Sequence, residues 1–380
     1  MRILLIGEYS GVFTELSTAL KNKGYDVFTI SNGDGYKKLP ADILFKYSLK
    51  QKRNLFDKLL NALRTYLGIM GLFDFFIKWR KYKPYFGNYD IVQLINPIAL
   101  TGYGSIANYI MIRYVCKHNK KVFLSVLGDD FYTVDYFRRI ISPSNHYFNT
   151  LKLREVFAGK YIWGFLYRKQ NDYVVKHCKG IMASAYGYLQ SYLFTEKCIK
   201  VLFPFPINQK YIGRPFTLKE GEPIIIFHGW QKGKEKRKGN DIFDRVIRKV
   251  VTKYGSIVDY RIVSGVTYEE YIKTYESAHI FIDQLYAEDK GYNALLGMAA
   301  GKVVFSGYNN QVLNTYPNYD GKIVGMDVTT DESTLFDRFC LLIDNPSLME
   351  EISRNAIDFV IKNHVSSFVT DMFIKSWRDL

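Results

Sequence analysis

The chain has 380 residues, 48% of them hydrophobic, and a formal net charge of +15 from 52 Lys and Arg against 37 Asp and Glu. This length predicts two or three domains, and the hydrophobic fraction excludes a disordered chain. There is no apolar run of about 18 residues, the length that a membrane-spanning helix needs. The four cysteines are widely spaced, which excludes a disulfide framework and favours a reducing cytoplasm.

The chain opens with a strand–helix–strand pattern. Apolar residues at 3–6 and 26–30 predict two strands, and residues 12–23 predict the helix between them. The loop that joins the first strand to the helix contains Glu8, Tyr9, Ser10 and Gly11. It lacks the GxGxxG spacing of a dinucleotide fingerprint. It is therefore either a plain strand-to-helix turn or a loop that faces a ligand.

Residues 50–83 are basic and aromatic at once. They include nine Lys or Arg residues, with large apolar side chains between them. Leu55, Leu59 and Leu63 recur at helical spacing, which predicts an amphipathic helix. Such a helix either lies on an anionic lipid surface or packs its apolar face on the core of the domain. The positive net charge favours the lipid surface and an anionic substrate over nucleic acid, because no nucleic-acid motif accompanies it.

The next strand and helix predicted are 91–95 and 105–118, and a strand at 122–127 runs into Gly128, Asp129 and Asp130. Ligand sites of α/β proteins form at the carboxyl ends of such strands. One of the two acids can orient or deprotonate a substrate hydroxyl, or cap the following helix. After a further strand at 180–184, the two prolines of residues 201–206 predict the exit from the first domain.

A second α/β unit begins with a predicted strand at 224–227, which ends at His228 and Gly229. The loop 230–238 that follows holds five basic residues and precedes a predicted helix at 242–254. The loop either neutralises a bound anion or is simply solvated. His228 differs from the other histidines because it ends a strand beside this basic loop.

Residues 280–305 form the most informative stretch. An apolar run ends at Asp283, a loop carries Glu288 and Gly291, and a small-residue helix begins near Asn293. A loop of this kind places backbone N–H groups and the positive end of a helix beside a bound phosphate. An acid just before the helix can hold sugar hydroxyls. The pattern suits a nucleotide-sugar site, and the alternative is an ordinary helix–strand unit.

Residues 288–304 resemble the donor-site signature of GT-B glycosyltransferases, above all that of the large retaining family 4. That signature is Glu, seven residues, Glu, and then Ala-Met-Ala-x-Gly-x-Val-Val. Glu288 takes the place of the first Glu, Gly291 that of the family glycine, and residues 298–304 match the tail. Leu296 stands where the family has its second Glu, which usually contacts the ribose.

The resemblance implies an α/β fold with two Rossmann-like domains that face a cleft, and a last helix that crosses back to the first domain. Residues 1–207, joined by 366–380, would form the acceptor-side domain. Residues 208–365 would form the nucleotide-sugar-binding domain. Retention of the anomeric configuration is also implied. The logic calls for no metal and no cofactor besides the nucleoside-diphosphate sugar itself.

The resemblance also implies roles for single residues. Lys238 and Gly239 match the Lys-Gly pair of the family's diphosphate loop, whereas Trp230 stands at the usual Arg position, so that Arg237 or Lys232 would substitute. The expected catalytic residues are Glu288, Lys238, Arg237, Asp129 and Asp130. The expected donor-binding residues are His228, Gly229, Lys232, Gly239, Tyr268 (which would stack on the base), Asp283, Gly291, Tyr292 and Asn293. The acceptor-side residues are Glu8, Tyr9, Ser10 and Gly11.

The expected function is sugar transfer from a nucleoside-diphosphate sugar to a hydroxyl of a glycan or polyprenyl-linked glycan, in surface polysaccharide synthesis. The expected location is the cytoplasmic face of the cell membrane, with peripheral attachment to an anionic surface and no nucleic-acid partner. Two alternatives remain: a GT-B sugar-nucleotide epimerase and a catalytically silent membrane-bound scaffold.

Overall fold

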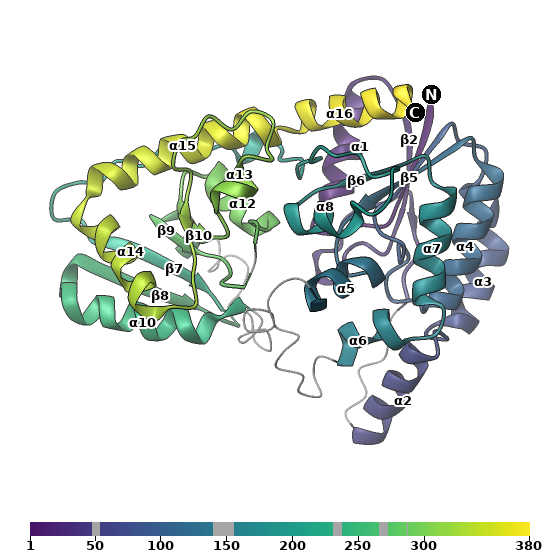
Figure 1. Ribbon diagram of the computed structural model, residues 1–380, viewed down its shortest axis with the longest axis horizontal. Coiled ribbons are helices and arrows are strands. Elements are labelled where there is room, and N and C mark those ends of the chain that lie inside the picture. The colour runs from purple at the N-terminus through teal and green to yellow at the C-terminus, as the bar shows by residue number, and fades with distance from the viewer. Residues whose placement is uncertain (48–53, 140–155, 231–237, 266–272, 287) are drawn as a thin grey trace. The chain divides into compact units, whose positions relative to one another are not determined.

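A computed structural model of the chain describes residues 1–47, 54–139, 156–230, 238–265, 273–286 and 288–380 (Figure 1). The chain divides into two compact units. The first contains Met1–Pro206 together with Val369–Leu380, and the second contains Ile207–Phe368. Each unit is built around its own parallel sheet.

The first unit holds a six-stranded sheet in the order β3-β2-β1-β4-β5-β6, with every neighbouring pair parallel. Its strands are β1 (Arg2–Ile6), β2 (Asp26–Ser31), β3 (Ile43–Leu44), β4 (Ile91–Leu94), β5 (Lys121–Val126) and β6 (Gly180–Ala183). Every residue of β4 and of β6 is buried, as expected where helices cover both faces of a sheet. The order reverses between β1 and β4, so the loops after these two strands meet at the switch point where α/β folds bind ligands.

The helices of the first unit are α1 (Val12–Asn22), α2 (Leu55–Tyr66), α3 (Leu72–Tyr82), α4 (Ser105–His118), α5 (Phe131–Arg139), α6 (Val156–Trp163), α7 (Tyr167–His177), α8 (Tyr186–Tyr192) and α16 (Ser366–Asp379). The turn between β1 and α1 requires glycine at Gly7. Its φ is +94°, and a Cβ there would lie 2.2 Å from Cγ2 of Ile95. A side chain at this position would therefore push β1 away from β4.

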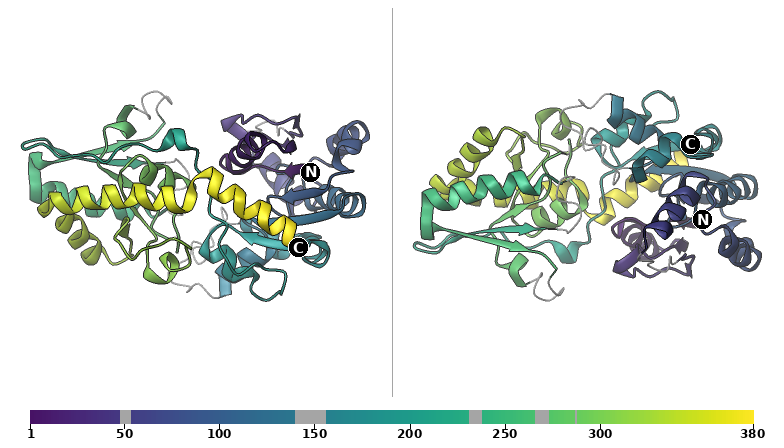
Figure 2. Two further views of the ribbon diagram at one scale, coloured as in Figure 1. Left: turned by 90° about the horizontal axis from the view of Figure 1, so that it is seen from above. Right: turned by 90° about the horizontal axis from the view of Figure 1, so that it is seen from below.

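The last helix returns to the first unit, as the sequence predicts. Trp377 of α16 is buried, and its indole N–H donates to Oε1 of Gln93 on β4 at 2.8 Å. Lys121 at the start of β5 donates to the carbonyl of the same tryptophan at 3.1 Å. Figure 2 shows the two ends of the chain on this unit. The first unit is thus made of two separate segments of the chain.

The second unit holds a five-stranded parallel sheet in the order β11-β10-β9-β7-β8. Its strands are β7 (Ile224–Gly229), β8 (Val258–Val263), β9 (Ile280–Ile282), β10 (Val303–Ser306) and β11 (Met326–Asp327). Its helices are α10 (Asn240–Tyr254), α12 (Tyr292–Ala299), α13 (Asn310–Leu313), α14 (Glu332–Asp344) and α15 (Pro346–His364). Numbered within the unit, this is the 2-1-3-4-5 order of flavodoxin-like sheets, whose switch point lies between β7 and β9.

The core of the second unit lies between this sheet and its helices. Phe243 and Val246 of α10 and Phe339 of α14 are fully buried against the strands, and the rings of Phe305 and Phe339 stack at 4.1 Å. This packing holds the strands in place, and with them the loops that follow their carboxyl ends. Among the helices of the described segments, none has the length and apolar character that crossing a bilayer requires.

Candidate functional site

The candidate site of the second unit lies at the carboxyl ends of β7, β9 and β10. The β7–β9 pairing sets His228 opposite Ile282, and Asp283 is the first residue after β9. Ser306 ends β10. Because these strands are neighbours in a parallel sheet, their last residues meet at one edge, at the switch point of the strand order.

An ion pair fixes the centre of this edge. The ammonium of Lys238 lies 3.3 Å from Oδ1 of Asp283, and the hydroxyl of Ser306 donates to Oδ2 at 3.1 Å. The Asp283 side chain is only 3% exposed, whereas that of Lys238 is 21% exposed. The backbone N–H of Leu285 also donates to the Lys238 carbonyl at 2.9 Å. The segment that starts α10 is thereby tied to the segment that follows β9.

Glycine is required beside this lysine. Gly239 has a φ of +69°, and a Cβ there would lie 2.5 Å from Cβ of Leu285. The dipeptide Lys238-Gly239 therefore has a steric basis, because the glycine lets the chain pass Leu285 and enter α10. The positive φ of Gly239, just before α10, sets the direction of the chain at Lys238.

Glu288 is an acid with an unusual proton affinity. Burial, and then the charge of Asp289, raise the pKa of Glu288 to about 7. Its Oε2 atom is buried and has no hydrogen-bond partner within the described segments. A carboxyl group in this state can both donate and accept hydrogen bonds near neutral pH. It can therefore bind a ligand hydroxyl, whichever way that hydroxyl is oriented.

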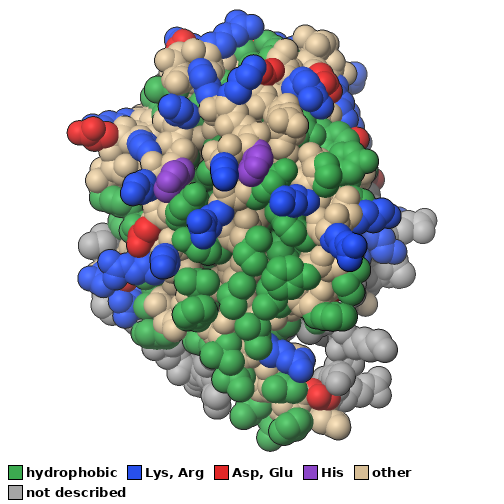
Figure 3. Space-filling model, turned by 90° about the vertical axis from the view of Figure 1, so that its right-hand side faces the viewer, with side chains coloured by type: hydrophobic (Ala, Val, Ile, Leu, Met, Phe, Trp, Pro, Cys, Tyr) green, Lys and Arg blue, Asp and Glu red, His purple; other side chains and the backbone are tan. Residues whose placement is uncertain are grey.

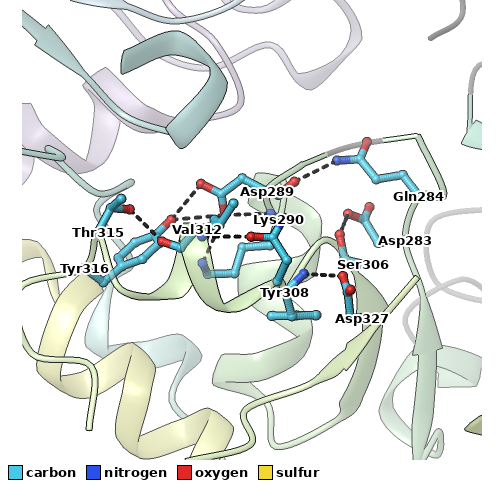
Figure 4. Close-up of polar contacts among 11 residues, drawn as sticks. Asp283, Gln284, Asp289, Lys290, Ser306, Tyr308, Val312, Thr315, Tyr316 and Asp327 are labelled. Atoms are coloured by element: carbon cyan, nitrogen blue, oxygen red, sulfur yellow. Dashed lines mark hydrogen bonds and ion pairs between the residues drawn. The ribbon is translucent and has the colours of Figure 1, made fainter. Parts of the chain in front are cut away.

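The next two residues form a buried charged pair (Figure 4). The ammonium of Lys290, whose side chain is fully buried, lies 3.1 Å from Oδ1 of Asp289. It also lies 3.7 Å from the centre of the Tyr316 ring and 4.8 Å from that of Phe359. The Tyr316 hydroxyl donates to Oδ2 of Asp289 at 3.1 Å. Burial lowers the pKa of Lys290, and Asp289 acts in the opposite direction.

This pair anchors the loop in front of α12. Gln284 adds a further tie, since its side-chain amide donates to the Asp289 carbonyl at 3.5 Å. Sequence reasoning missed the pair, because a lysine between an acid and a glycine is typical of a solvated loop. It also missed Ser306, although that residue occupies the strand end next to Asp283 and was open to the same argument.

Gly291 precedes α12 and has a φ of −84°, so its backbone does not require glycine. A Cβ at this position would stand 3.5 Å from Nε2 of Gln284 and 3.6 Å from Oδ2 of Asp283. The glycine therefore keeps a side chain out of the space in front of Asp283. Tyr292 and Asn293 form the first turn of α12, where backbone N–H groups have no intrahelical acceptor and attract anions.

His228 is a fully buried histidine at the end of β7. Burial lowers its pKa to about 4, although Asn240 and Asp244 act in the opposite direction. Its Nδ1 lies 2.7 Å from the Tyr260 hydroxyl, which itself donates to Asp244 at 3.2 Å. The hydroxyl has one proton, so Nδ1 of His228 is the donor and Nε2 carries a lone pair. Within the described residues Nε2 has no hydrogen-bond partner, and Gly229 follows it at the strand end.

In the first unit, the loop after β1 is organised around Glu8. The carboxylate of Glu8 is buried and accepts the backbone N–H groups of Gly11 at 3.1 Å and Thr14 at 2.8 Å, as well as the Thr14 hydroxyl at 2.7 Å. It therefore caps the first turn of α1, which is the plain strand-to-helix alternative for this acid. The Ser10 N–H donates to Asp34 at 2.9 Å, and Ser10 itself has a positive φ of 59°.

Tyr9 differs from its neighbours in this loop. A ring carbon of Tyr9 lies 3.4 Å from the position that a Cβ on Gly128 would take, so the ring covers the turn after β5. Burial, and then the charge of Asp129, raise the pKa of the Tyr9 hydroxyl. The structure thus brings Tyr9, an expected acceptor-side residue, near Asp129, an expected catalytic residue.

The Asp130 carboxylate has a structural role. It is fully buried, and it accepts the Thr133 N–H at 2.9 Å and the Tyr192 hydroxyl at 2.7 Å. Burial raises the pKa of Asp130 to about 6. Of the two acids after β5, Asp130 is therefore the one that caps α5. The exposed fraction of Asp129 is intermediate, which leaves it the better candidate for a substrate hydroxyl.

Three expected site residues, Lys232, Arg237 and Tyr268, fall in the segments 231–237 and 266–272, outside the residues that the structure describes. Within the described segments, no group of three or more His, Cys, Asp or Glu side chains is placed to hold a metal ion.

The architecture was compared with known proteins. No protein-family model and no curated protein matches the sequence. The structure matches sucrose-phosphate synthase from Thermosynechococcus elongatus at 14% identity and a TM-score of 0.58, over 100% of this chain and 99% of that one. It matches Anabaena HepE in complex with UDP at 11% identity and a TM-score of 0.57, and the lipopolysaccharide outer core galactosyltransferase WaaB at 10% identity and a TM-score of 0.56. Both matches cover 100% of each chain.

The chain has the GT-B fold. The prediction of two parallel-sheet α/β units is confirmed by the two strand orders and by the full-length matches. In GT-B terms, the candidate donor residues Lys238, Asp283 and Glu288 belong to the second unit. Tyr9 and Asp129 belong to the first.

Proposed function

We propose that this GT-B protein is a glycosyltransferase that moves a sugar from a nucleoside-diphosphate sugar to a hydroxyl of a glycan or lipid-linked glycan, in surface polysaccharide synthesis. The observation that carries the proposal is the pairing of Lys238 with Asp283 beside the N-terminus of α12. A cation and a helix end at one strand edge form a site for a diphosphate.

In this role Lys238 stabilises the leaving diphosphate. Its ammonium is held in place by Asp283 before any ligand arrives, so no reorganisation is needed when negative charge develops on the leaving oxygen. The first-turn N–H groups of α12 add a second set of donors. His228 keeps the edge of β7 neutral, because its low pKa prevents protonation near neutral pH.

Glu288 is proposed to bind the hydroxyls of the transferred sugar, which we take to be a hexose transferred with retention. Its Oε2 is buried and has no hydrogen-bond partner among the described residues, which supports this role. The likeness to HepE, solved in complex with UDP-glucose, makes a uridine diphosphate sugar the first donor to test. Asp129, beside Tyr9 in the first unit, is proposed to orient or deprotonate the acceptor hydroxyl. We place the enzyme at the inner face of the cell membrane as a peripheral protein.

Calorimetry with UDP, GDP and ADP tests the donor site. Binding of one nucleoside diphosphate in the presence of EDTA supports a site that needs no metal. Absence of binding to all three would favour a silent scaffold. Incubation with the matching sugar nucleotide, with and without a lipid-linked acceptor, separates the remaining alternatives. Release of a sugar epimer without acceptor would contradict transfer, and NMR of the product reports whether the configuration is retained.

A further inference from the structure

Helix α2 turns its apolar side away from the described part of the first unit. None of its residues is buried. The four large apolar side chains of its outer stripe are 55–76% exposed: Leu55, Phe56, Leu59 and Leu63. Leu55, Leu59 and Leu63 stand at positions i, i+4 and i+8, and Phe56 lies next to Leu55. The four side chains therefore share one face of the helix. The sequence alone left open whether this face packs on the core of the unit, and among the described residues nothing covers it.

The side of α2 that faces the unit mixes polar and apolar residues. Its half-buried residues are Asp57, Leu60, Asn61, Ala62, Thr65 and Tyr66. At its C-terminal end the helix is tied to the unit by the Phe165 N–H, which donates to the Tyr66 carbonyl at 2.7 Å. A surface helix of a globular protein ordinarily turns its apolar stripe to the core and polar residues to solvent, whereas α2 exposes four large apolar side chains. The outer stripe of α2 therefore needs an apolar partner that the described unit does not supply.

The exposed stripe continues onto α3. On this helix Phe75 and Trp79 are buried and stack on each other at 5.3 Å, whereas Phe73 is 82% exposed. Trp163, at the end of α6, and Phe165 are also exposed. We call these side chains together the apolar face: Leu55, Phe56, Leu59, Leu63, Leu67, Phe73, Phe76, Ile77, Trp163 and Phe165. Exposed patches of this extent mark interaction sites.

Basic side chains accompany the apolar face. The exposed ones on and just after the two helices are Lys58, Arg64, Arg80, Lys81 and Lys83. Of the two acids on these helices, Asp74 is held by Lys78 at 2.8 Å, and Asp57 lies on the inner side of α2. Figure 3 views this side of the first unit, and shows hydrophobic side chains gathered toward the lower end, with Lys and Arg above and beside them. The face therefore combines apolar area with positive charge.

We propose that the apolar face enters the headgroup–acyl boundary of an anionic bilayer, with α2 lying in the plane of the membrane. Leu, Phe and Trp on one side and Lys and Arg beside them are the composition of interfacial helices. The positive charges match anionic headgroups, which a second copy of this chain would not supply. The inference deepens the proposed membrane location. It rests on the proposed function only in taking the lipid to carry the acceptor.

Vesicle co-sedimentation tests the apolar part of the proposal. The test variant is Phe56→Gln, Leu59→Gln and Phe73→Gln together. We expect it to bind vesicles that contain phosphatidylglycerol at least tenfold more weakly than the wild type, at low and at high salt. The matched control replaces exposed apolar residues of the second unit, Ile257→Gln, Leu341→Gln and Ile361→Gln. It should bind like the wild type. Both variants should keep the wild-type melting temperature, since all six side chains are exposed.

A second variant tests the charge. Each Lys or Arg near an anionic surface strengthens binding by about fivefold at low salt. Lys58→Gln, Arg80→Gln and Lys81→Gln together should therefore weaken binding at least tenfold at low salt and flatten its decline with added salt. The control variant Lys219→Gln, Lys273→Gln and Lys375→Gln removes the same charge from other exposed positions. It should change binding less than threefold or so by the same electrostatic argument.

The proposal would be overturned if the apolar variant bound vesicles as well as the wild type does. It would also be overturned if the test and control variants lost vesicle binding equally. Light scattering gives a further decision. A wild-type dimer that the apolar variant converts to a monomer would assign the face to a second copy of the chain. UDP binding is measured on the same proteins without vesicles. If the wild type does not bind UDP, the proposed donor site is refuted, but the vesicle result still stands. Failure of the proposed function can therefore be distinguished from failure of the membrane proposal.

Discussion

The carboxylate of Asp283 holds the ammonium of Lys238 at 3.3 Å, although the two residues are 45 positions apart in the chain. The pair joins the loop before α10 to the loop after β9, and the Ser306 hydroxyl holds the second carboxylate oxygen. The lysine remains partly exposed and the aspartate does not. A diphosphate that reaches this edge would therefore meet the cation and not the acid.

Lys238→Ala should lower turnover by roughly ten- to thousand-fold, because it removes one stabiliser of the leaving group. It should also weaken UDP binding, and it should lower the melting temperature, because it leaves the buried Asp283 carboxylate without its cation. Steady-state kinetics and calorimetry measure these effects. Lys219→Ala, an exposed lysine of the same unit, is the control. Unchanged kcat together with unchanged diphosphate affinity would refute the role of Lys238.

Glu288→Gln should inactivate the enzyme and stabilise it. The folded state holds the proton of Glu288 up to a pKa of about 7, above the ordinary value of 4.5. Because the unfolded chain releases this proton first, the free energy of unfolding falls as pH rises between these values, by at most roughly 3 kcal/mol. Glutamine has no such proton. The variant should match the wild type at acid pH and melt higher above neutral pH.

UDP affinity should stay unchanged in Glu288→Gln, since the carboxyl is assigned to the sugar. Glu332 is a control of opposite sign, because Lys249 and Arg245 lower the pKa of its carboxyl. Glu332→Gln should be less stable than the wild type at neutral pH, and this difference should vanish as pH falls through the depressed pKa. A parallel loss of UDP binding and activity in Glu288→Gln would show that the acid contacts the diphosphate.

Lys290→Met and Asp289→Asn should each lower the free energy of unfolding by roughly 3–5 kcal/mol, because each leaves one buried charge without its partner. The double variant should lose clearly less than the sum, since both charges are then gone. Urea denaturation of the four proteins measures the coupling. Strict additivity of the two losses would mean that the charges do not interact in solution.

Asp129 and Asp130 should separate activity from stability. Asp130→Ala removes the acceptor for the Thr133 N–H and the Tyr192 hydroxyl, so it should lower the free energy of unfolding by ~1 kcal/mol or more. Its turnover, measured well below the melting temperature, should be close to that of the wild type. Asp129→Ala should reduce turnover and leave the melting temperature nearly unchanged. If instead Asp130→Ala lost turnover and Asp129→Ala did not, the role at the acceptor hydroxyl would belong to Asp130.

Local patterns predicted much of the fold. Buried parallel strands are continuous apolar runs, so β1, β5, β7 and β9 were visible in the sequence. The dipeptide Lys238-Gly239 was found through its resemblance to a family motif. The steric need for its glycine comes from Leu285, which is distant in the chain, so the sequence did not show it.

The contacts of individual side chains were not predictable. Glu8 was an expected acceptor-side residue, but its carboxylate accepts the N–H groups of Gly11 and Thr14. The sequence analysis made no prediction for Lys290, because only the fold brings Tyr316 and Phe359 around its ammonium. The periodicity of residues 55–66 identified an apolar stripe, but not the direction in which it points. Each miss concerns what a side chain faces, which tertiary packing decides.

The return of α16 to the first unit has a consequence for how the protein is made. Trp377 reaches Gln93 only after the whole of the second unit has left the ribosome, because residues 207–368 are translated in between. Until then Gln93 of β4 and Lys121 of β5 lack their partners on Trp377. The second unit, which is continuous in the chain, can close first. The first unit is therefore translated first but completed last. A fragment of residues 1–206 expressed alone should aggregate, whereas a fragment of residues 207–368 should remain in solution.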